Sequence, residues 1–223
     1  MLLIGRSLMA TLRSPTRGDG MTEKKKAPKI AILGWGSLIW DERPEFDKHH
    51  EEWLPDGPVL KLEFSRISET RKGALTLVID SGNGSACVSA YAISTRKNPD
   101  DAIADLRCRE GTVMRRMGFY FRDGSRTCAP DVPATIAPWA AEKGFDVVVW
   151  TGLPGNFKRE TGKGFTVPNA ISHLQSLEPE GKAMAAEYVW RAPDFVKTEL
   201  RTALQIEPWF PVPQAPADAE DAG

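Results

Sequence analysis

The residue best placed for acid–base chemistry is Glu110, at the end of the segment 98–110. If that segment is a helix, about 100° of rotation per residue puts Glu110 on the same face as Ile103 and Leu106. Those two apolar side chains are expected to be buried, so Glu110 is expected to be partly desolvated. Burial raises the pKa of a carboxyl group, which can then act as a general base and next as a general acid. Most helical glutamates instead reach solvent or pair with a neighbour, here Arg107, and this alternative stays open.

A second candidate feature is the run Gly34-Trp-Gly-Ser-Leu-Ile-Trp-Asp41, which follows an apolar segment. It begins like a dinucleotide-binding fingerprint, but the third glycine is missing. Asp41 also follows too soon in the sequence to be the acidic residue that binds a ribose, which is expected about 20 positions on. A nicotinamide cofactor is therefore disfavoured. What remains is a turn whose backbone N–H groups, at Gly36, Ser37 and Leu38, can bind an anion or a carbonyl oxygen. The equally weighted alternative is a tight turn whose two tryptophans fill the end of a barrel.

The other reactive side chains give weaker signals. His49, His50 and His173 lack the spacing of a metal site, and the first two adjoin a Lys/Glu-rich segment where solvated side chains are expected. No metal ion is therefore expected. Arg66 and Arg71 can bind a substrate carboxylate in bidentate fashion, although arginines at a sheet edge are more often solvated.

The composition is that of an ordinary globular chain. Of its 223 residues, 41% are hydrophobic and 26% are charged, which excludes a largely disordered protein. The 29 basic and 30 acidic side chains give a formal charge of −1, so neither nucleic acid nor a membrane surface is an expected partner. No run of about 18 apolar residues predicts a membrane span. The 3 cysteines lack a CxxC pair, which favours a reducing, cytoplasmic location.

The elements that must position these residues follow from hydrophobic patterning. Strands are expected early in the chain, at 29–33, 74–79, 86–93 and 146–151, with hairpin turns at 81–84 and 123–124. Helices are expected later, at 98–110, 168–177, 181–190 and 194–205. This order predicts an α+β fold, with a curved, mostly antiparallel sheet or a small barrel flanked by helices.

The ends of the chain differ in composition from its middle. Residues 1–27 are expected to form a disordered basic tail, and the Pro/Ala/Asp-rich residues 211–223 a disordered acidic tail. Residues 28–210 are expected to form one domain, because no linker or repeat interrupts them.

Several motifs resemble one family in order and spacing. The run Trp35-Gly-Ser-Leu38 is similar to the Y-G-S-L loop of the gamma-glutamylcyclotransferase-like family, with tryptophan in the tyrosine position. Leu106-Arg-Cys-Arg-Glu110 resembles the L-x-x-R-E pattern of the glutathione-degrading branch, at the end of the helix that bears the catalytic glutamate. Segments 62–79, 85–93 and 147–154 are similar to the other strands of the family. The resemblance spans roughly residues 29–204.

This resemblance implies an activity and a site. A gamma-glutamyl amide or peptide, the small-molecule substrate, cyclises to 5-oxoproline and releases an amine, as in glutathione metabolism. Glu110 is the implied general acid/base, and Trp35, Gly36, Ser37 and Leu38 are the implied substrate-binding residues. No cofactor or metal is required.

Two departures from the family pattern leave an alternative open. Gly-Thr-Val follows Glu110 where the family has a Gly-Gly-Tyr run, which makes Tyr120 the candidate for a nearby phenol, and the segment 41–58 is longer and more charged than the family loop. The alternative is a non-catalytic domain on the same fold that binds a small anion or a partner protein. A Glu110 remote from the loop at 35–38 favours that alternative, whereas a shared cleft favours the enzyme. No pair of carboxylates with suitable spacing supports a third possibility, a hydrolase.

Overall fold

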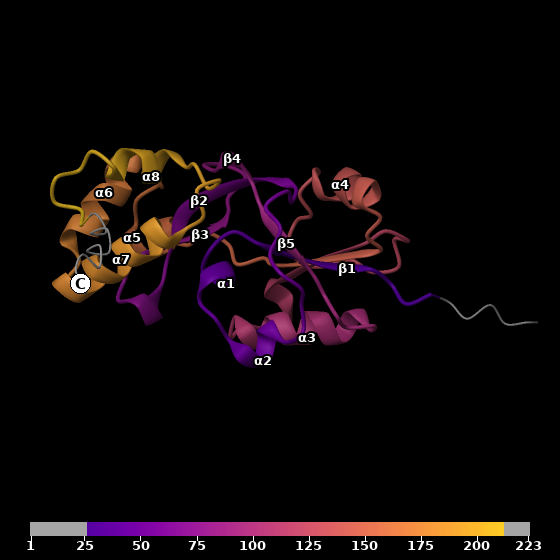
Figure 1. Cartoon of the computed structure of the whole chain (residues 1–223). Helices are drawn as coiled ribbons and strands as arrows, with labels where there is room; N and C mark the ends of the chain where they lie inside the picture. The colour runs from indigo at the N-terminus through magenta and orange to yellow at the C-terminus, as the bar shows by residue number, and fades with distance from the viewer. Residues whose placement is uncertain (1–25, 212–223) are drawn as a thin grey trace, which may run out of the picture.

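The structure is a computed structural model that describes residues 26–211 (Figure 1). Most of the two expected tails, 1–27 and 211–223, therefore lies outside the described residues. The strands are β1 (Ile30–Gly34), β2 (Val59–Ile67), β3 (Leu75–Ile79), β4 (Ser85–Val88), β5 (Ala90–Ile93), β6 (Met117–Phe121) and β7 (Val147–Thr151). The helices are α1 (Ser37–Trp40), α2 (Pro44–Asp47), α3 (Pro99–Arg109), α4 (Ile136–Lys143), α5 (Phe157–Thr161), α6 (Val167–Ser176), α7 (Pro179–Arg191) and α8 (Glu199–Leu204), with short 3-10 turns η1 (Glu69–Arg71) and η2 (Met114–Arg116).

The strands form two sheets. One has the order β5-β1-β7-β6 and contains a parallel pair, β1 with β7, between antiparallel neighbours. The other has the order β3-β2-β4 and is antiparallel throughout. The expected α+β class is confirmed, but the described residues contain two sheets and no closed barrel.

Both expected hairpins are wrong, although a turn is present at each position. The turn at 81–84 joins β3 to β4, yet both of these strands pair with β2, which lies between them. The turn at 123–124 follows β6, which pairs with the distant β7. Turn chemistry fixes where the chain bends, whereas the pairing partner depends on burial of the whole strand.

The four-stranded sheet is buried on both faces. Alternate residues of β1 belong to two different apolar clusters: Ala31 and Leu33 to one, Ile30 and Ile32 to the other. The second cluster includes side chains of α3, and the first includes side chains of α4 and of the three-stranded sheet. Figure 1 shows α3 and α4 on opposite sides of β1. The period-2 alternation of a strand thus packs against a different layer on each face.

Helix α3 forms where the sequence predicts it. The Asn98 side chain accepts a hydrogen bond from the backbone N–H of Asp100 at 3.1 Å, which caps the first turn. Ile103 and Leu106 are fully buried. Glu110 is the C-cap residue, and Gly111 follows it in the left-handed region with φ of 55°.

The later helices agree with the sequence in part. The helices expected at 168–177 and 181–190 correspond to α6 and α7, but α8 is shorter than the expected 194–205. Arg201 explains the difference, because its guanidinium donates hydrogen bonds to the carbonyl oxygens of Ala192, Pro193 and Val196 and so fixes a non-helical turn. Within residues 26–211, no helix is both long enough and apolar enough to cross a membrane.

The charged segment 41–58 is not a separate flap. After α2 it runs antiparallel to β5, and the backbone N–H groups of Glu51, Leu54 and Gly57 each donate to a carbonyl oxygen of the segment 89–93 at 2.8 Å. The insertion therefore extends the edge of the four-stranded sheet.

Glu63 is a fully buried carboxylate in β2. Its oxygens accept hydrogen bonds from the backbone N–H of Phe64 at 2.7 Å and of Leu200 at 3.5 Å, so it joins β2 to the start of α8. Burial raises the pKa of Glu63, against the effect of these hydrogen bonds. Because the folded-state pKa lies above the unfolded value, the stability that this group contributes is present at low pH and is lost as the pH rises through the folded pKa.

We therefore expect Glu63→Gln to raise the melting temperature near pH 8 by roughly 2–4 °C, the shift that about 1 kcal/mol produces in a domain of this size. The gain is expected to shrink near pH 4, where Glu63 is mostly protonated in both states. Scanning calorimetry at the two pH values measures both effects, and Glu52→Gln, at an exposed position, is the control. A variant that melts below the parent near pH 8 contradicts the prediction.

Candidate functional site

The parallel pair of strands positions the candidate site. The carboxyl ends of β1 and β7 lie at the same edge of the sheet, and α3 ends beside them. A cavity of about 350 Å³ opens there. Its lining includes the strand-end loop (residues 34–38), the end of α3, Thr151 of β7 and Tyr188 of α7.

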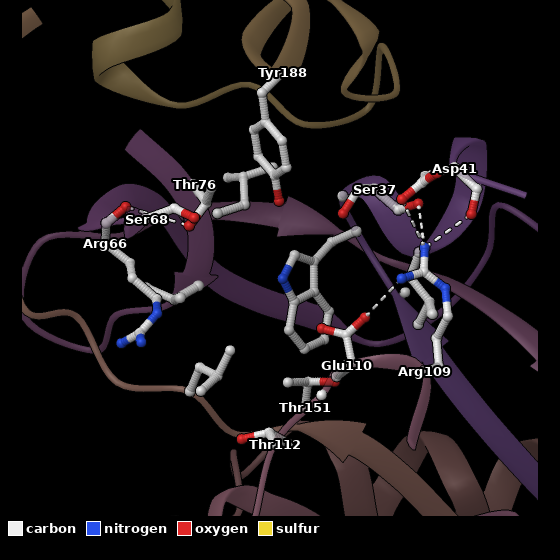
Figure 2. Close-up of a pocket in the computed structure, with 18 of the residues that line it drawn as sticks. Ser37, Asp41, Arg66, Ser68, Thr76, Arg109, Glu110, Thr112, Thr151 and Tyr188 are labelled. Atoms are coloured by element: carbon white, nitrogen blue, oxygen red, sulfur yellow. Dashed lines mark hydrogen bonds and ion pairs between the residues drawn. The ribbon is translucent and has the colours of Figure 1, made fainter. Parts of the chain in front are cut away.

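All five site residues predicted from the sequence line this one cavity: Trp35, Gly36, Ser37, Leu38 and Glu110. Figure 2 shows the Glu110 carboxylate and Ser37 on neighbouring walls of the cavity, with Tyr188 reaching in from a third direction. The helix face to which the sequence assigns Glu110 does point into the cavity, and the strand-end loop lines the same cavity.

The strand-end loop leads directly into the one-turn helix α1. Gly36 is its N-cap residue, and its carbonyl oxygen accepts from the N–H of Ile39 at 2.9 Å. In the described part of the chain, the backbone N–H groups of Ser37 and Leu38 have no backbone acceptor. The Ser37 backbone instead bonds the Tyr188 phenol, so Leu38 has the orphan donor of this first helical turn. Both residues line the cavity. The Leu38 side chain itself is buried in the core.

Glu110 carries a partly buried carboxyl group, with 20% of its side chain exposed. Burial raises the pKa of Glu110, the guanidinium of Arg109 opposes that rise, and the nearby carboxylate of Asp41 adds to it. The hydroxyl of Thr112, close by in the cavity lining, is buried and has no hydrogen-bond partner among the described residues. The Glu110 carboxyl group and an unsatisfied hydroxyl therefore belong to the lining of the same cavity.

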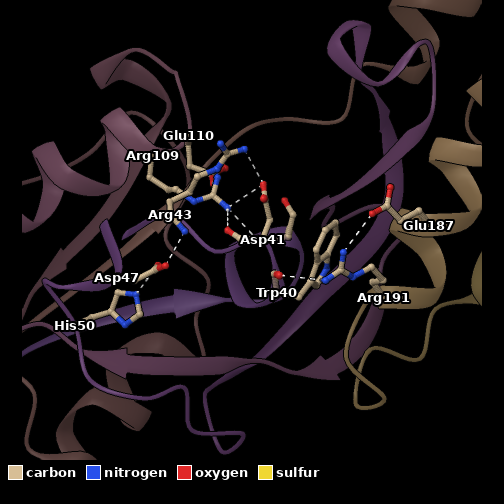
Figure 3. A network of polar contacts seen from close by, with 10 residues as sticks. Trp40, Asp41, Arg43, Asp47, His50, Arg109, Glu110, Glu187 and Arg191 are labelled. Carbon is tan, nitrogen blue, oxygen red and sulfur yellow. Dashed lines mark hydrogen bonds and ion pairs between the residues drawn. The ribbon is translucent and has the colours of Figure 1, made fainter. Parts of the chain in front are cut away.

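Arg109 links Glu110 to the wall of the cavity formed by α1 and the residue after it. Its Nη2 donates to the carbonyl oxygens of Ser37 at 3.2 Å and Asp41 at 2.8 Å, and its Nη1 lies 3.7 Å from the Glu110 carboxylate (Figure 3). Its side chain is only 6% exposed. Sequence analysis missed this residue, because the groups that it contacts come from α1, about seventy positions earlier in the chain.

The phenol of the site comes from Tyr188 and not from Tyr120. Tyr120 lies in β6 and is not part of the cavity lining, whereas Tyr188 is 5% exposed and lines it. Burial raises the pKa of Tyr188, and the negative charge of Glu110 raises it further, so the phenol stays protonated. The available signal was a hydroxyl-bearing residue on the buried face of the helix at 181–190.

Gly36 allows Tyr188 to approach the loop. A Cβ atom on Gly36 would lie 2.6 Å from Tyr188 Oη and 3.5 Å from its Cζ. Contact at the first distance is impossible without a shift of the loop or of the buried ring. The glycine therefore has a packing role that is independent of its place in a turn.

We expect Gly36→Ala to destabilise the protein by about 1–3 kcal/mol, the usual cost of overpacking, and to move Tyr188 out of the cavity. Urea unfolding measures the first effect. Gly164→Ala is the matched control, because a Cβ there meets no atom within 4 Å. Unfolding curves that coincide for the Gly36→Ala variant and the parent contradict the prediction.

The structure corrects one expectation about the histidines. The His50 side chain is 6% exposed and packs between Phe46 and Trp53, with ring centroids 4.9 and 5.1 Å away. It is therefore a core residue and not part of a solvated face. Among the described residues, no group of three or more His, Cys, Asp and Glu side chains is arranged to hold a metal ion.

A second cavity, of about 630 Å³, lies on the other side of Leu153. Its lining is mostly apolar, and Lys61 and Asp131 are the ionisable side chains in it. It offers hydrophobic contact but no arrangement for acid–base chemistry. The first cavity is therefore the candidate active site.

Comparisons with family models, with curated proteins and with solved structures find no match for this chain.

Proposed function

We propose that the protein is a gamma-glutamyl cyclotransferase, which converts a gamma-glutamyl amide or peptide to 5-oxoproline and a free amine. The observation that carries the proposal is the meeting, in one cavity, of the Glu110 carboxyl group and the strand-end loop. The raised pKa of Glu110 supports it, because a carboxyl group titrating closer to neutrality both accepts and returns a proton readily.

Binding of the gamma-glutamyl unit can use groups already present in the cavity. The Arg71 guanidinium lies 4.8 Å from the centroid of the Tyr188 ring, and no ion pair is found for it in the described part of the chain. It is free to bind the substrate α-carboxylate in bidentate fashion. The N–H group of Leu38 is then the donor available to the γ-carbonyl oxygen, since the backbone of Ser37 already bonds the Tyr188 phenol.

The reaction is a ring closure within the bound substrate. The α-ammonium gives a proton to Glu110, and the resulting amine attacks the γ-carbonyl carbon and forms a carbon–nitrogen bond. Glu110 returns that proton to the amide nitrogen as the original carbon–nitrogen bond breaks. It then takes the second proton from the new ring nitrogen and passes it to the released amine, which gives 5-oxoproline and the amine in its protonated form. Holding the substrate folded supplies a large effective molarity, and one N–H donor to the developing oxyanion is worth about 3 kcal/mol.

The direct test is incubation of the purified protein with gamma-glutamyl dipeptides, glutathione and gamma-glutamyl amines. We expect chromatography to detect 5-oxoproline and the released amine in equal amounts from at least one of them. Absence of 5-oxoproline across this panel contradicts the proposal.

The positive charge of the cavity supports a second candidate function. Five arginines and two carboxylic acids line it, so a non-catalytic domain that binds small anions would use the same walls. Calorimetry with the same panel separates the two functions, since binding without 5-oxoproline supports the second.

A further inference from the structure

The cavity has two chemically different ends. Glu110, Tyr188 and Arg71 form one end, where their charges act on one another. Arg66 and Arg116 form the other end. Each makes a hydrogen bond with the backbone of the segment that follows β7. Figure 2 shows Arg66 on the far side of the cavity from Arg109 and Glu110. A substrate whose γ-carbonyl lies beside Glu110 therefore extends its leaving group either toward Arg66 or out to solvent.

Arg66 and Arg116 are held on the same short segment, 152–154. Nη1 of Arg66 donates to the carbonyl oxygen of Pro154 at 3.0 Å, and the carbonyl oxygen of Arg116 accepts from the N–H of Gly152 at 2.7 Å. Both residues are partly buried and line the cavity. The remaining guanidinium N–H groups are free of protein hydrogen bonds within residues 26–211, so the pair can receive a ligand.

These two positive charges are not neutralised by the protein. No ion pair is found for either arginine among the described residues. Burial lowers the pKa of Arg66, and the positive charge of Arg116 lowers it further. Glu160, the acid whose charge acts most on Arg66, is already bonded to Arg159 at 2.5 Å. The charges of Glu160 and Glu69 only partly offset the effect of Arg116 on Arg66, so an anion bound between the two arginines reduces their repulsion.

A gamma-glutamyl unit has no net negative charge, so it does not provide the anion that these arginines lack. With both acids ionised, the cavity has a formal charge of +3, from Arg43, Arg66, Arg71, Arg109 and Arg116 against Asp41 and Glu110. The unit brings one α-carboxylate and one α-ammonium, which cancel. Two of the three net positive charges, those of Arg66 and Arg116, lie at the end toward which a leaving group can extend.

We propose that Arg66 and Arg116 select substrates whose leaving group carries a carboxylate, so that gamma-glutamyl amino acids or peptides are preferred over gamma-glutamyl amines. This inference rests on the proposed function and names the substrate class of the same site. The leaving-group carboxylate accepts charge-assisted hydrogen bonds from the two guanidinium groups, which are stronger than bonds between neutral partners.

The test compares gamma-glutamylglycine with gamma-glutamylglycinamide, which has nearly the same shape but no carboxylate. We expect the parent protein to prefer the acid by about tenfold or more in kcat/KM, the ratio that corresponds to about 1.4 kcal/mol. Arg116→Gln is expected to reduce that ratio about tenfold, and Arg66→Gln to reduce it similarly while Arg66→Lys restores part of it. Arg115→Met, at an exposed neighbour outside the cavity lining, is the control that keeps the parent ratio.

The outcomes separate the two proposals. If 5-oxoproline forms from both compounds with equal kcat/KM, or if Arg116→Gln leaves the ratio unchanged, the selectivity is overturned and the cyclotransferase stands. If neither these compounds nor any member of the gamma-glutamyl panel above yields 5-oxoproline, the cyclotransferase is overturned as well. Calorimetric Kd values for the two compounds on Glu110→Gln protein measure the preference without turnover, and equal values overturn the carboxylate site.

Discussion

Glu110→Gln is expected to reduce the rate of 5-oxoproline formation by about 10²–10⁴-fold, the usual contribution of a general acid/base. Glutamine has nearly the same shape and keeps the hydrogen-bonding reach of the side chain, but it can neither accept the ammonium proton nor protonate the leaving nitrogen. The buried neighbours Ile103 and Leu106 are untouched, so the fold is expected to persist. Stopped-time assays with chromatographic detection of 5-oxoproline measure the loss.

Two further variants make this result specific. Glu110→Asp keeps the carboxyl group but withdraws it by one methylene, so an intermediate rate is expected. Glu142→Gln removes a carboxylate from an exposed position outside the cavity and is expected to match the parent. A Glu110→Gln protein that works as fast as the Glu142→Gln control removes Glu110 from the mechanism.

Arg109→Met is expected to have the second-largest effect, because it acts on stability and on Glu110 together. The change removes the guanidinium donor to the carbonyl oxygens of Ser37 and Asp41, and hydrogen bonds to a charged group contribute about 1.5–3 kcal/mol. It also removes the guanidinium that favours the ionised form of Glu110, while Asp41 remains. The pKa of Glu110 is therefore expected to rise further.

A pH profile distinguishes this positioning role from simple loss of stability. We attribute the acid limb of kcat/KM to Glu110, which must be ionised to accept the proton, so activity falls as the pH drops through its pKa. In Arg109→Met protein that limb is expected to move to higher pH. Arg107→Met, at an exposed position in the same helix, is expected to leave it in place. An unchanged limb in the Arg109→Met profile shows that Arg109 has no influence on Glu110.

Local sequence signals predicted several elements but not their pairing. The strand expected at 86–93 is wrong, because it is divided into β4 and β5, which belong to different sheets, and α4 was not predicted. The apolar runs gave β1 and β7, and the cap residues Asn98 and Gly111 gave the ends of α3. The sequence could not indicate that β2 lies between β3 and β4, because that order depends on which strand buries most surface. The one-turn helices α1 and α2 are too short to show a helical period.

Some residues of the candidate site were predictable from the sequence and others were not. Glu110 followed from its position on a helix face, and the strand-end loop from its glycines and from the family resemblance. Tyr188 did not, since nothing in the local pattern of α7 connects it with Gly36, although the two are in contact in the fold. The charge of the cavity was likewise hidden, because its arginines come from segments spread between residues 43 and 116 and are brought together only by the two sheets.

Because β1 lies between β5 and β7, its two edges become paired at different times during synthesis. β5 pairs with one edge of β1 early in synthesis, but the other edge waits for β7. At ordinary elongation rates, the ribosome takes about 3–10 seconds to make the residues in between. During that interval the strand Ile30–Gly34 offers an apolar, unpaired backbone to any neighbouring nascent chain. Fast translation and early chaperone binding are therefore expected to improve the yield of native protein.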